Sequence, residues 1–166
     1  MKRFLYFFLC FVMLISLLPA ASRAETTGAG SSDDPFADVT TPHLLLIEAE
    51  SGAVLYSRGA DEKAFPASTT KIMTALLAVE SGRLRETVTV PKEAAGTEGS
   101  SMYLKAGETL PLADLVYGLM LTSGNDAAVA IACLLDGSSA AFADRMNARA
   151  EALGLNDTHF VTPNGL

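Results

Sequence analysis

The sequence predicts a mixed α/β fold of the α+β type, in which an antiparallel sheet packs against a cluster of helices. Two apolar runs flank Ser51-Gly52, which is typical of a β-hairpin. From Ser68 onward apolar residues recur at helical spacing, and three more helical segments follow. Because two strands rarely form a stable sheet, we expect later strands that residues 1–166 do not contain.

The hairpin is expected over residues 44–58. Its first run, LLLI, is apolar at every position, which predicts a strand buried on both faces. The helix that follows is almost wholly apolar and has a stop signal at Ser81-Gly82, so we expect it to be buried in the middle of a domain. Its main apolar stripe consists of Ile72, Ala75, Leu76 and Val79, joined by Met73 and Leu77 on the adjoining stripe.

The second half of the chain reads as a short strand, a loop and a group of helices. TVTVP is the strand candidate, and the Gly-rich run GTEGSSMYLKAGE is the loop. Helices are expected over residues 112–121, 125–135 and 138–153, and Gly154 is a good C-terminal cap for the last of them.

The chain is expected to be exported. Lys2 and Arg3 precede a long apolar run and a small-residue cleavage site, so residues 1–24 match a secretory signal peptide rather than a retained anchor. Residues 25–42, rich in Gly, Ser, Thr, Asp and Pro, predict a flexible linker. Ordered structure is expected from His43 onward, over residues 43–166. The location is therefore the cell envelope, outside the cytoplasm.

Charge excludes several kinds of partner. The net charge is −7, and removal of residues 1–24 takes away three basic residues and no acidic one, which gives −7 − 3 = −10. Such a balance argues against binding to nucleic acid or to an anionic membrane. No phosphate-binding loop or zinc pattern is present, and neither His43 nor His159 has a triad or metal partner by spacing, so no cofactor and no metal are expected.

Ser68 and Lys71 lie at i and i+3 where the apolar helix begins, so both side chains share one face. A serine hydroxyl becomes a nucleophile when a base takes its proton, and a neutral lysine can be that base. Burial and the positive end of the helix dipole both favour the neutral amine. The alternative is an ordinary helix start, with Ser68 as N-cap and Lys71 reaching solvent.

A second polar cluster, Ser123-Gly124-Asn125, occupies the turn between two apolar helices. A hydroxyl and a carboxamide there could relay a proton and hold a substrate amide. The alternative is a plain connecting turn in which Asn125 or Asp126 caps the next helix.

Taken together, these motifs resemble the penicillin-binding proteins and serine β-lactamases. More narrowly, the chain looks like the low-molecular-weight D-alanyl-D-alanine carboxypeptidases, the S11 serine peptidases. Four stretches carry this resemblance, in this order after the hairpin: PASTTKIMTALLAVE, SSMYLKAGE, LMLTSGNDAAVAIA and THFVTPNGL. The resemblance covers residues 43–166. It implies the β-lactamase/transpeptidase-like fold.

The resemblance also implies roles for four residues and two kinds of ligand. Ser68 matches the nucleophile and Lys71 its general base. Ser123 matches a proton relay to the leaving D-alanine, and Asn125 a hydrogen-bond partner of the acyl side chain and of Lys71. The substrate is expected to be the peptidoglycan pentapeptide, with β-lactam antibiotics as inhibitors, no nucleic acid, and membrane association only through regions downstream.

The family's Lys-Thr/Ser-Gly strand is absent from residues 1–166. We therefore expect the N-terminal part of such an enzyme, and we expect these residues alone neither to hydrolyse nor to become stably acylated. The alternatives are a β-lactamase-type hydrolase and a truncated, non-catalytic peptidoglycan-binding relative.

Overall fold

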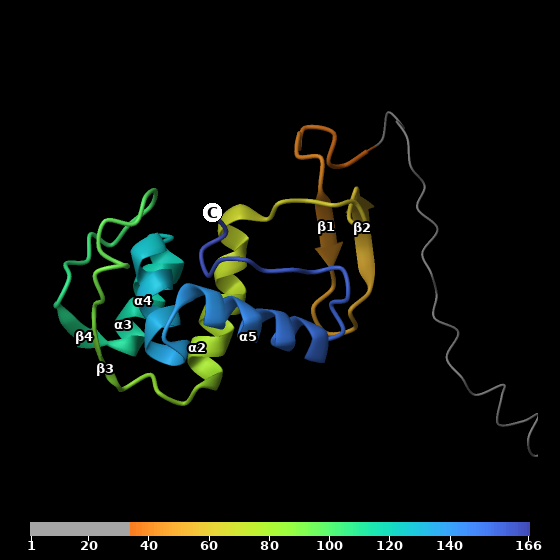
Figure 1. Ribbon diagram of the computed structural model, residues 1–166. Helices are drawn as coiled ribbons and strands as arrows, with labels where there is room; N and C mark the ends of the chain where they lie inside the picture. The colour runs from red at the N-terminus through yellow and green to blue at the C-terminus, as the bar shows by residue number, and fades with distance from the viewer. Residues whose placement is uncertain (1–33) are drawn as a thin grey trace, which may run out of the picture. The chain divides into compact units, whose positions relative to one another are not determined.

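The computed structural model describes residues 34–166 (Figure 1). The predicted signal peptide, residues 1–24, lies outside the described residues, as does the first half of the predicted linker. The chain divides into two compact units, of which one ends at Ala64 and the other spans Phe65–Leu166. The first unit contains the hairpin, and the second contains the helices.

The predicted hairpin is confirmed, with a longer connection than expected. Strands β1 (Leu44–Ile47) and β2 (Val54–Arg58) pair antiparallel, and the register shifts at the end of β1. The connection runs over residues 48–53 because the Glu48 carboxylate accepts hydrogen bonds from the amides of the turn and from the Ser51 hydroxyl. The Ser51 hydroxyl is the largest of the causes that lower the pKa of Glu48 to about 2.

The prediction that the first strand is buried on both faces is wrong for the described residues. Leu45 and Ile47 are 49% and 48% exposed. Within residues 34–166 the hairpin forms a two-stranded sheet, so β1 pairs with β2 on one edge and has no strand on the other. An apolar run shows that a strand can be buried, but burial needs a covering element.

The residues just before the hairpin bond to β2. The Asp34 carboxylate accepts hydrogen bonds from the Tyr56 hydroxyl and from Arg58, both at 2.9 Å. Arg58 also donates to the Phe36 carbonyl at 2.9 Å, and the Phe36 ring packs against Tyr56 with centroids 4.5 Å apart. The segment 34–42 falls in the range predicted as linker, and the domain boundary at residue 42 stays a prediction.

The larger unit contains four helices, and a short 3₁₀ helix leads into the first of them. The 3₁₀ helix η1 spans Ala67–Thr70 and runs directly into α2, Lys71–Glu80. The other three are α3 (Leu112–Leu121), α4 (Asn125–Asp136) and α5 (Ser139–Ala152). All three were predicted within one residue at each end.

The helix ends follow local sequence signals. Ser138 precedes α5 as its N-cap, and its hydroxyl accepts the Ala141 amide at 3.1 Å. Gly137 ends α4 in the left-handed conformation, with φ of 80°. These two residues also explain why the connection between α4 and α5 is so short.

The predicted strand TVTVP is also confirmed, and it has a partner that the sequence did not reveal. Strand β3 (Thr87–Thr89) pairs antiparallel with β4 (Thr109–Pro111), where Val88 lies opposite Leu110. The loop between these strands contains the Gly-rich run, and β4 leads directly into α3. This small sheet therefore brings both ends of the loop to the helices.

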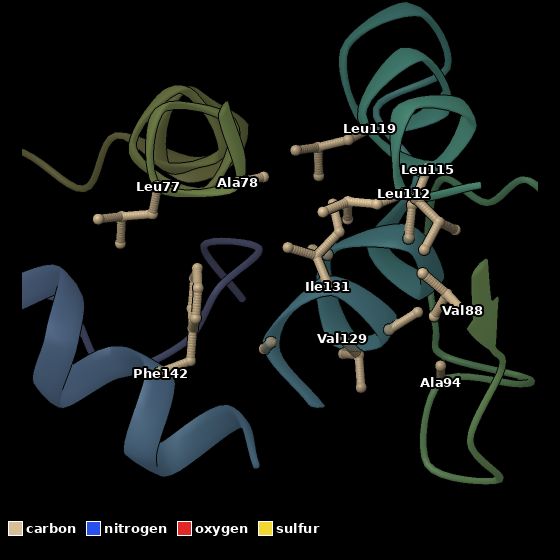
Figure 2. Close-up of a cluster of buried hydrophobic side chains, with 14 of the residues drawn as sticks. Leu77, Ala78, Val88, Ala94, Leu112, Leu115, Leu119, Val129, Ile131 and Phe142 are labelled. Carbon is tan, nitrogen blue, oxygen red and sulfur yellow. The ribbon is translucent and has the colours of Figure 1, made fainter. Parts of the chain in front are cut away.

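The core of the larger unit lies between the four helices (Figure 2). Ala78 of α2 points toward Leu119 of α3, and Leu77 leaves α2 on the side of Phe142 of α5. Ile131 of α4 lies in the middle of the cluster. The apolar stripe predicted for α2 is only partly right. Two of its members, Ile72 and Val79, are 61% and 52% exposed, and the buried face carries Met73, Thr74, Leu77 and Ala78.

No single helix within residues 34–166 has both the length and the apolar character to cross a membrane. Only α4 and α5 taken together reach that length, and they meet at a bend of 82°.

Candidate active site

Ser68 lies in η1, one turn before Lys71. Pro66 precedes the turn, and its carbonyl accepts the Thr69 amide at 3.1 Å. Ala67 has φ of 48°, in the left-handed region that residues other than glycine seldom adopt. The chain thus turns sharply just before Ser68, which is exposed, whereas Thr70 and Lys71 just after it are buried.

Lys71 is the first residue of α2, and its ammonium group is the centre of the site. It is 3% exposed. Its Nζ donates to Ser68 Oγ at 3.0 Å, to Ser123 Oγ at 3.2 Å and to the Asn164 carbonyl at 3.2 Å. The expected pair is thus brought together with the second serine, which lies far away in the sequence.

Burial lowers the pKa of Lys71 from its ordinary value of 10.5. The direction follows from charge alone, because an ammonium group loses hydration when it is buried and a neutral amine loses much less. No carboxylate within residues 34–166 forms an ion pair with Lys71, so no opposite charge there offsets the effect of burial. The arrangement thus favours the form that can accept a proton.

Ser123 lies in the tight turn between α3 and α4. The turn is closed by hydrogen bonds from the Thr122 and Gly124 amides to the Gly118 carbonyl, at 3.1 and 3.3 Å. Ser123 itself has φ of 55°, a second left-handed residue that is not glycine. Its hydroxyl thus accepts from Lys71 across a separation of 52 residues in the sequence.

Asn125 begins α4 and is 4% exposed. Its amide donates to the Ser100 carbonyl and its Nδ2 to the Glu98 carbonyl, both at 2.7 Å. Its Oδ1 is buried and accepts no hydrogen bond from the described residues. The bond to Lys71 that the resemblance implies is not formed here, and Lys71 donates to the Asn164 carbonyl instead.

The segment around Asn164 also contributes to the site, and sequence reasoning did not identify it as part of the site. The Asn164 carbonyl accepts from Lys71, and the preceding carbonyl, of Pro163, accepts from Thr74 Oγ1 at 2.6 Å. A Cβ on Gly165 would lie 2.0 Å from the Ala67 carbonyl oxygen, so only glycine fits against the Ser68 turn. The contacts to Lys71 and Thr74 are made by backbone carbonyls, and every residue type has a backbone carbonyl, so the sequence does not identify them.

The described residues contain no group of His, Cys, Asp and Glu that could hold a metal ion. His43 belongs to the hairpin unit, where its Nδ1 lies 2.8 Å from the Gly59 carbonyl. Cys133 is a free thiol in α4, and burial raises its pKa.

A serine hydroxyl, a buried lysine amine and a second hydroxyl in one cluster match the serine enzymes in which lysine replaces histidine as the base. The comparisons with known proteins name the family. The D-alanyl-D-alanine carboxypeptidase family, peptidase S11, matches residues 28–166. The chain belongs to this family.

Curated proteins that are similar to this chain are D-alanyl-D-alanine carboxypeptidases as well. D-alanyl-D-alanine carboxypeptidase DacF of Bacillus subtilis is 37% identical over 171 aligned positions, which cover 100% of this chain and 43% of the relative. DacA of Escherichia coli K12 is 44% identical over 74% of this chain and 33% of its own length. The chain thus spans less than half the length of these curated relatives.

Solved structures show the same fold. The DacD carboxypeptidase of Francisella tularensis has a TM-score of 0.73 and 34% identity over 90% of this chain and 38% of its own. Penicillin binding protein 5 of Haemophilus influenzae has a TM-score of 0.73 and 33% identity over 84% of this chain and 41% of its own. The described residues therefore have the mixed helix-and-sheet fold of the corresponding part of penicillin-binding proteins, as predicted.

Proposed function

We propose that the protein to which this chain belongs is a serine-type D-Ala-D-Ala carboxypeptidase that removes the terminal D-alanine of peptidoglycan stem peptides. The single observation that carries the proposal is the position of the Lys71 amine, 3.0 Å from Ser68 Oγ and 3.2 Å from Ser123 Oγ. A buried amine between two hydroxyls can take a proton from one and pass it to the other.

In the acylation step, neutral Lys71 takes the proton of Ser68 as Oγ attacks the carbonyl of the penultimate D-alanine. The peptide C–N bond breaks, and the leaving D-alanine receives a proton through Ser123. The backbone amide of Ser68 supplies half of the oxyanion hole, as the family resemblance implies. The product is an ester between Ser68 and the shortened peptide.

In the second step, water attacks the ester carbonyl and gives a proton to Lys71. The C–O bond to Ser68 breaks, the proton returns to Ser68 Oγ, and the peptide leaves as a carboxylate. β-Lactams acylate the same serine, and their ring opening leaves no small fragment to diffuse away. A long-lived adduct is therefore the expected result with penicillin.

Asn125 is proposed to hold the acyl side chain of the substrate. Its buried, unpaired Oδ1 supports this role, because an unpaired acceptor is costly unless a ligand supplies a donor. The peptidoglycan pentapeptide offers such amides along its backbone. Together with Ser68, Lys71 and Ser123, Asn125 makes up the proposed catalytic set.

Export is the remaining part of the proposal. The basic start and apolar run of residues 1–24 support a Sec-type signal peptide. The proposed peptidoglycan substrate would also place the enzyme in the cell envelope. The measurement is the intact mass of the protein recovered from the cell envelope. A mature chain that starts at Glu25 is expected, whereas retention of residues 1–24 would contradict cleavage at this site.

The test of the activity is acylation by penicillin in the complete product of the gene that encodes this chain. We expect an adduct of one penicillin at Ser68 by mass spectrometry, and release of D-alanine from a peptide that ends in D-Ala-D-Ala. Ser68→Ala should abolish both, while Ser57→Ala in the hairpin is the control. An adduct that persists in Ser68→Ala, or rapid turnover of penicillin without an adduct, would overturn the assignment.

A further inference from the structure

Asp126 is a fully buried carboxylate that the proposed mechanism does not use. It lies in the first turn of α4, directly after Asn125, and is 0% exposed. A buried charge is costly unless hydrogen bonds replace its hydration. The hydrogen bonds that Asp126 accepts therefore show which part of the structure its carboxylate stabilises.

Three of its four hydrogen bonds come from one loop. Asp126 accepts the Ser101 hydroxyl at 2.7 Å, the Met102 amide at 3.0 Å and the Leu104 amide at 2.9 Å, and the fourth donor is the Ala127 amide of its own helix. Burial acts to raise the pKa of Asp126, but these bonds together lower it. Asp126 is thus held as an anion.

The same loop bonds to Asn125. The Ser100 carbonyl accepts the Asn125 amide, and the Glu98 carbonyl accepts Asn125 Nδ2, both at 2.7 Å. A Cβ on Gly99 would lie 2.7 Å from Asn125 Nδ2 and 4.0 Å from Leu166, so the loop also borders the C-terminal segment of the site. Residues 98–104 therefore form one wall beside the proposed catalytic set.

The loop is held in a conformation that its own sequence does not favour. Tyr103, between the two amides that Asp126 binds, has φ of 62° and is 87% exposed. A left-handed residue with a bulky side chain persists only where its surroundings fix it. Met102 is fixed as well, because its side chain fills the space that a Cβ on Gly118 would occupy, with Sδ only 1.9 Å from that position.

We propose that Asp126 is a positioning residue, whose carboxylate fixes the loop of residues 98–104 and thereby the Glu98 carbonyl that orients the Asn125 side chain. This inference rests on the proposed function, because it assigns Asn125 to the acyl side chain of the substrate. Asp126 touches no reacting atom. Its loss should therefore affect ligands that carry an acyl amide and spare those that lack one.

The test compares two probes on the complete gene product. Penicillin G carries an acylamino side chain, and 6-aminopenicillanic acid lacks it. In Asp126→Asn we expect acylation by penicillin G to slow at least about 10-fold, and acylation by 6-aminopenicillanic acid to change less than about 3-fold. Asp114→Asn is the matched control, because Asp114 is exposed in the first turn of the neighbouring helix.

A merely structural role gives a different result. A variant that is partly unfolded loses acylation by both probes equally, and this equal loss would overturn the proposal. Asn125→Ala should show the same selectivity as Asp126→Asn, and the double variant should be no worse than Asn125→Ala alone. Additive losses would place the two residues in independent roles and would also overturn it.

Ser101→Ala gives a second variant in case Asp126→Asn fails to fold. It removes one loop bond to Asp126 and the Ser101 acceptor of the Tyr103 amide, so a smaller loss with the same selectivity is expected. Hydrogen exchange of residues 98–104 tests the loop without any substrate. Faster exchange confined to that segment supports the proposal, and unchanged exchange refutes it. A wild-type protein that neither probe acylates would refute the proposed function instead.

Discussion

Replacement of Lys71 separates a general base from a fixed positive charge. Lys71→Arg keeps a cation near Ser68 and Ser123, but a guanidinium does not deprotonate in proteins. Lys71→Met keeps much of the apolar stem and removes the amine. If the neutral amine takes the proton of Ser68, both variants should lose acylation to the same extent.

The expected loss follows from the chemistry that Lys71 supplies. A positioned general base contributes about 10²–10⁴-fold to a rate. At 1.36 kcal/mol for each factor of ten, this equals about 3–5 kcal/mol of the acylation barrier. The wild-type rate should rise with pH through the lowered pKa of Lys71 and reach its plateau below pH 10.5, where an ordinary lysine titrates.

Stability should rise with pH over the same range as activity. Between the lowered pKa of Lys71 and 10.5 the unfolded chain binds more protons than the folded one, so the free energy of unfolding rises with pH across that window. Lys71→Met should remove this contribution. Buried Lys71 thus lowers the free energy of unfolding below pH 10.5, as expected of a group that is needed for the reaction and not for stability.

The assay is the rate of labelling by a fluorescent penicillin from pH 6 to 10, with urea unfolding of the same samples. Lys105→Met, in an exposed part of the loop, is the control for the loss of a positive charge. An Arg variant that acylates within about 10-fold of the wild type would refute the general-base assignment. A wild-type rate that keeps rising up to pH 10 without a plateau would contradict the lowered pKa.

Three further predictions concern the scaffold, and each is checked by urea unfolding. Phe142→Ala should cost about 3–5 kcal/mol of unfolding free energy, because the ring is 0% exposed among the four helices. Ser138→Ala should cost about 1 kcal/mol through loss of the cap to the Ala141 amide. Gly118→Ala should cost about 1–3 kcal/mol, because its Cβ would displace Met102. A loss below about 0.5 kcal/mol at any of these would contradict the packing described.

The helices could be predicted because their limits are local. Ser138 and Gly137 are recognisable cap residues, and the apolar spacing of α3 and α4 needs no distant partner. Burial was predicted less well, since exposure depends on what covers an element. Ile47 in β1 and Val79 in α2 are apolar and yet about half exposed in the described residues.

The site could be predicted where side chains carry the chemistry. Ser68 and Lys71 are close in sequence, so helical spacing alone placed them on one face, whereas Ser123 entered the site through the family resemblance. The Asn164 carbonyl could not be found, because a backbone acceptor leaves no trace in residue type. Asp126 was visible only as a possible helix cap, and its loop bonds depend on the tertiary fold.

Strained backbone conformations occur in three segments of the proposed site that are distant from one another in the sequence. The non-glycine residues with positive φ in the described chain are Ala67, Tyr103 and Ser123. Ala67 precedes the proposed nucleophile, Ser123 is the second hydroxyl, and Tyr103 lies in the loop that Asp126 holds. Such conformations cost about 1–3 kcal/mol each and persist where surrounding contacts fix them. The three coincide with the proposed site because presenting its side chains requires sharp turns, which the buried helices and the Asp126 bonds then hold in place.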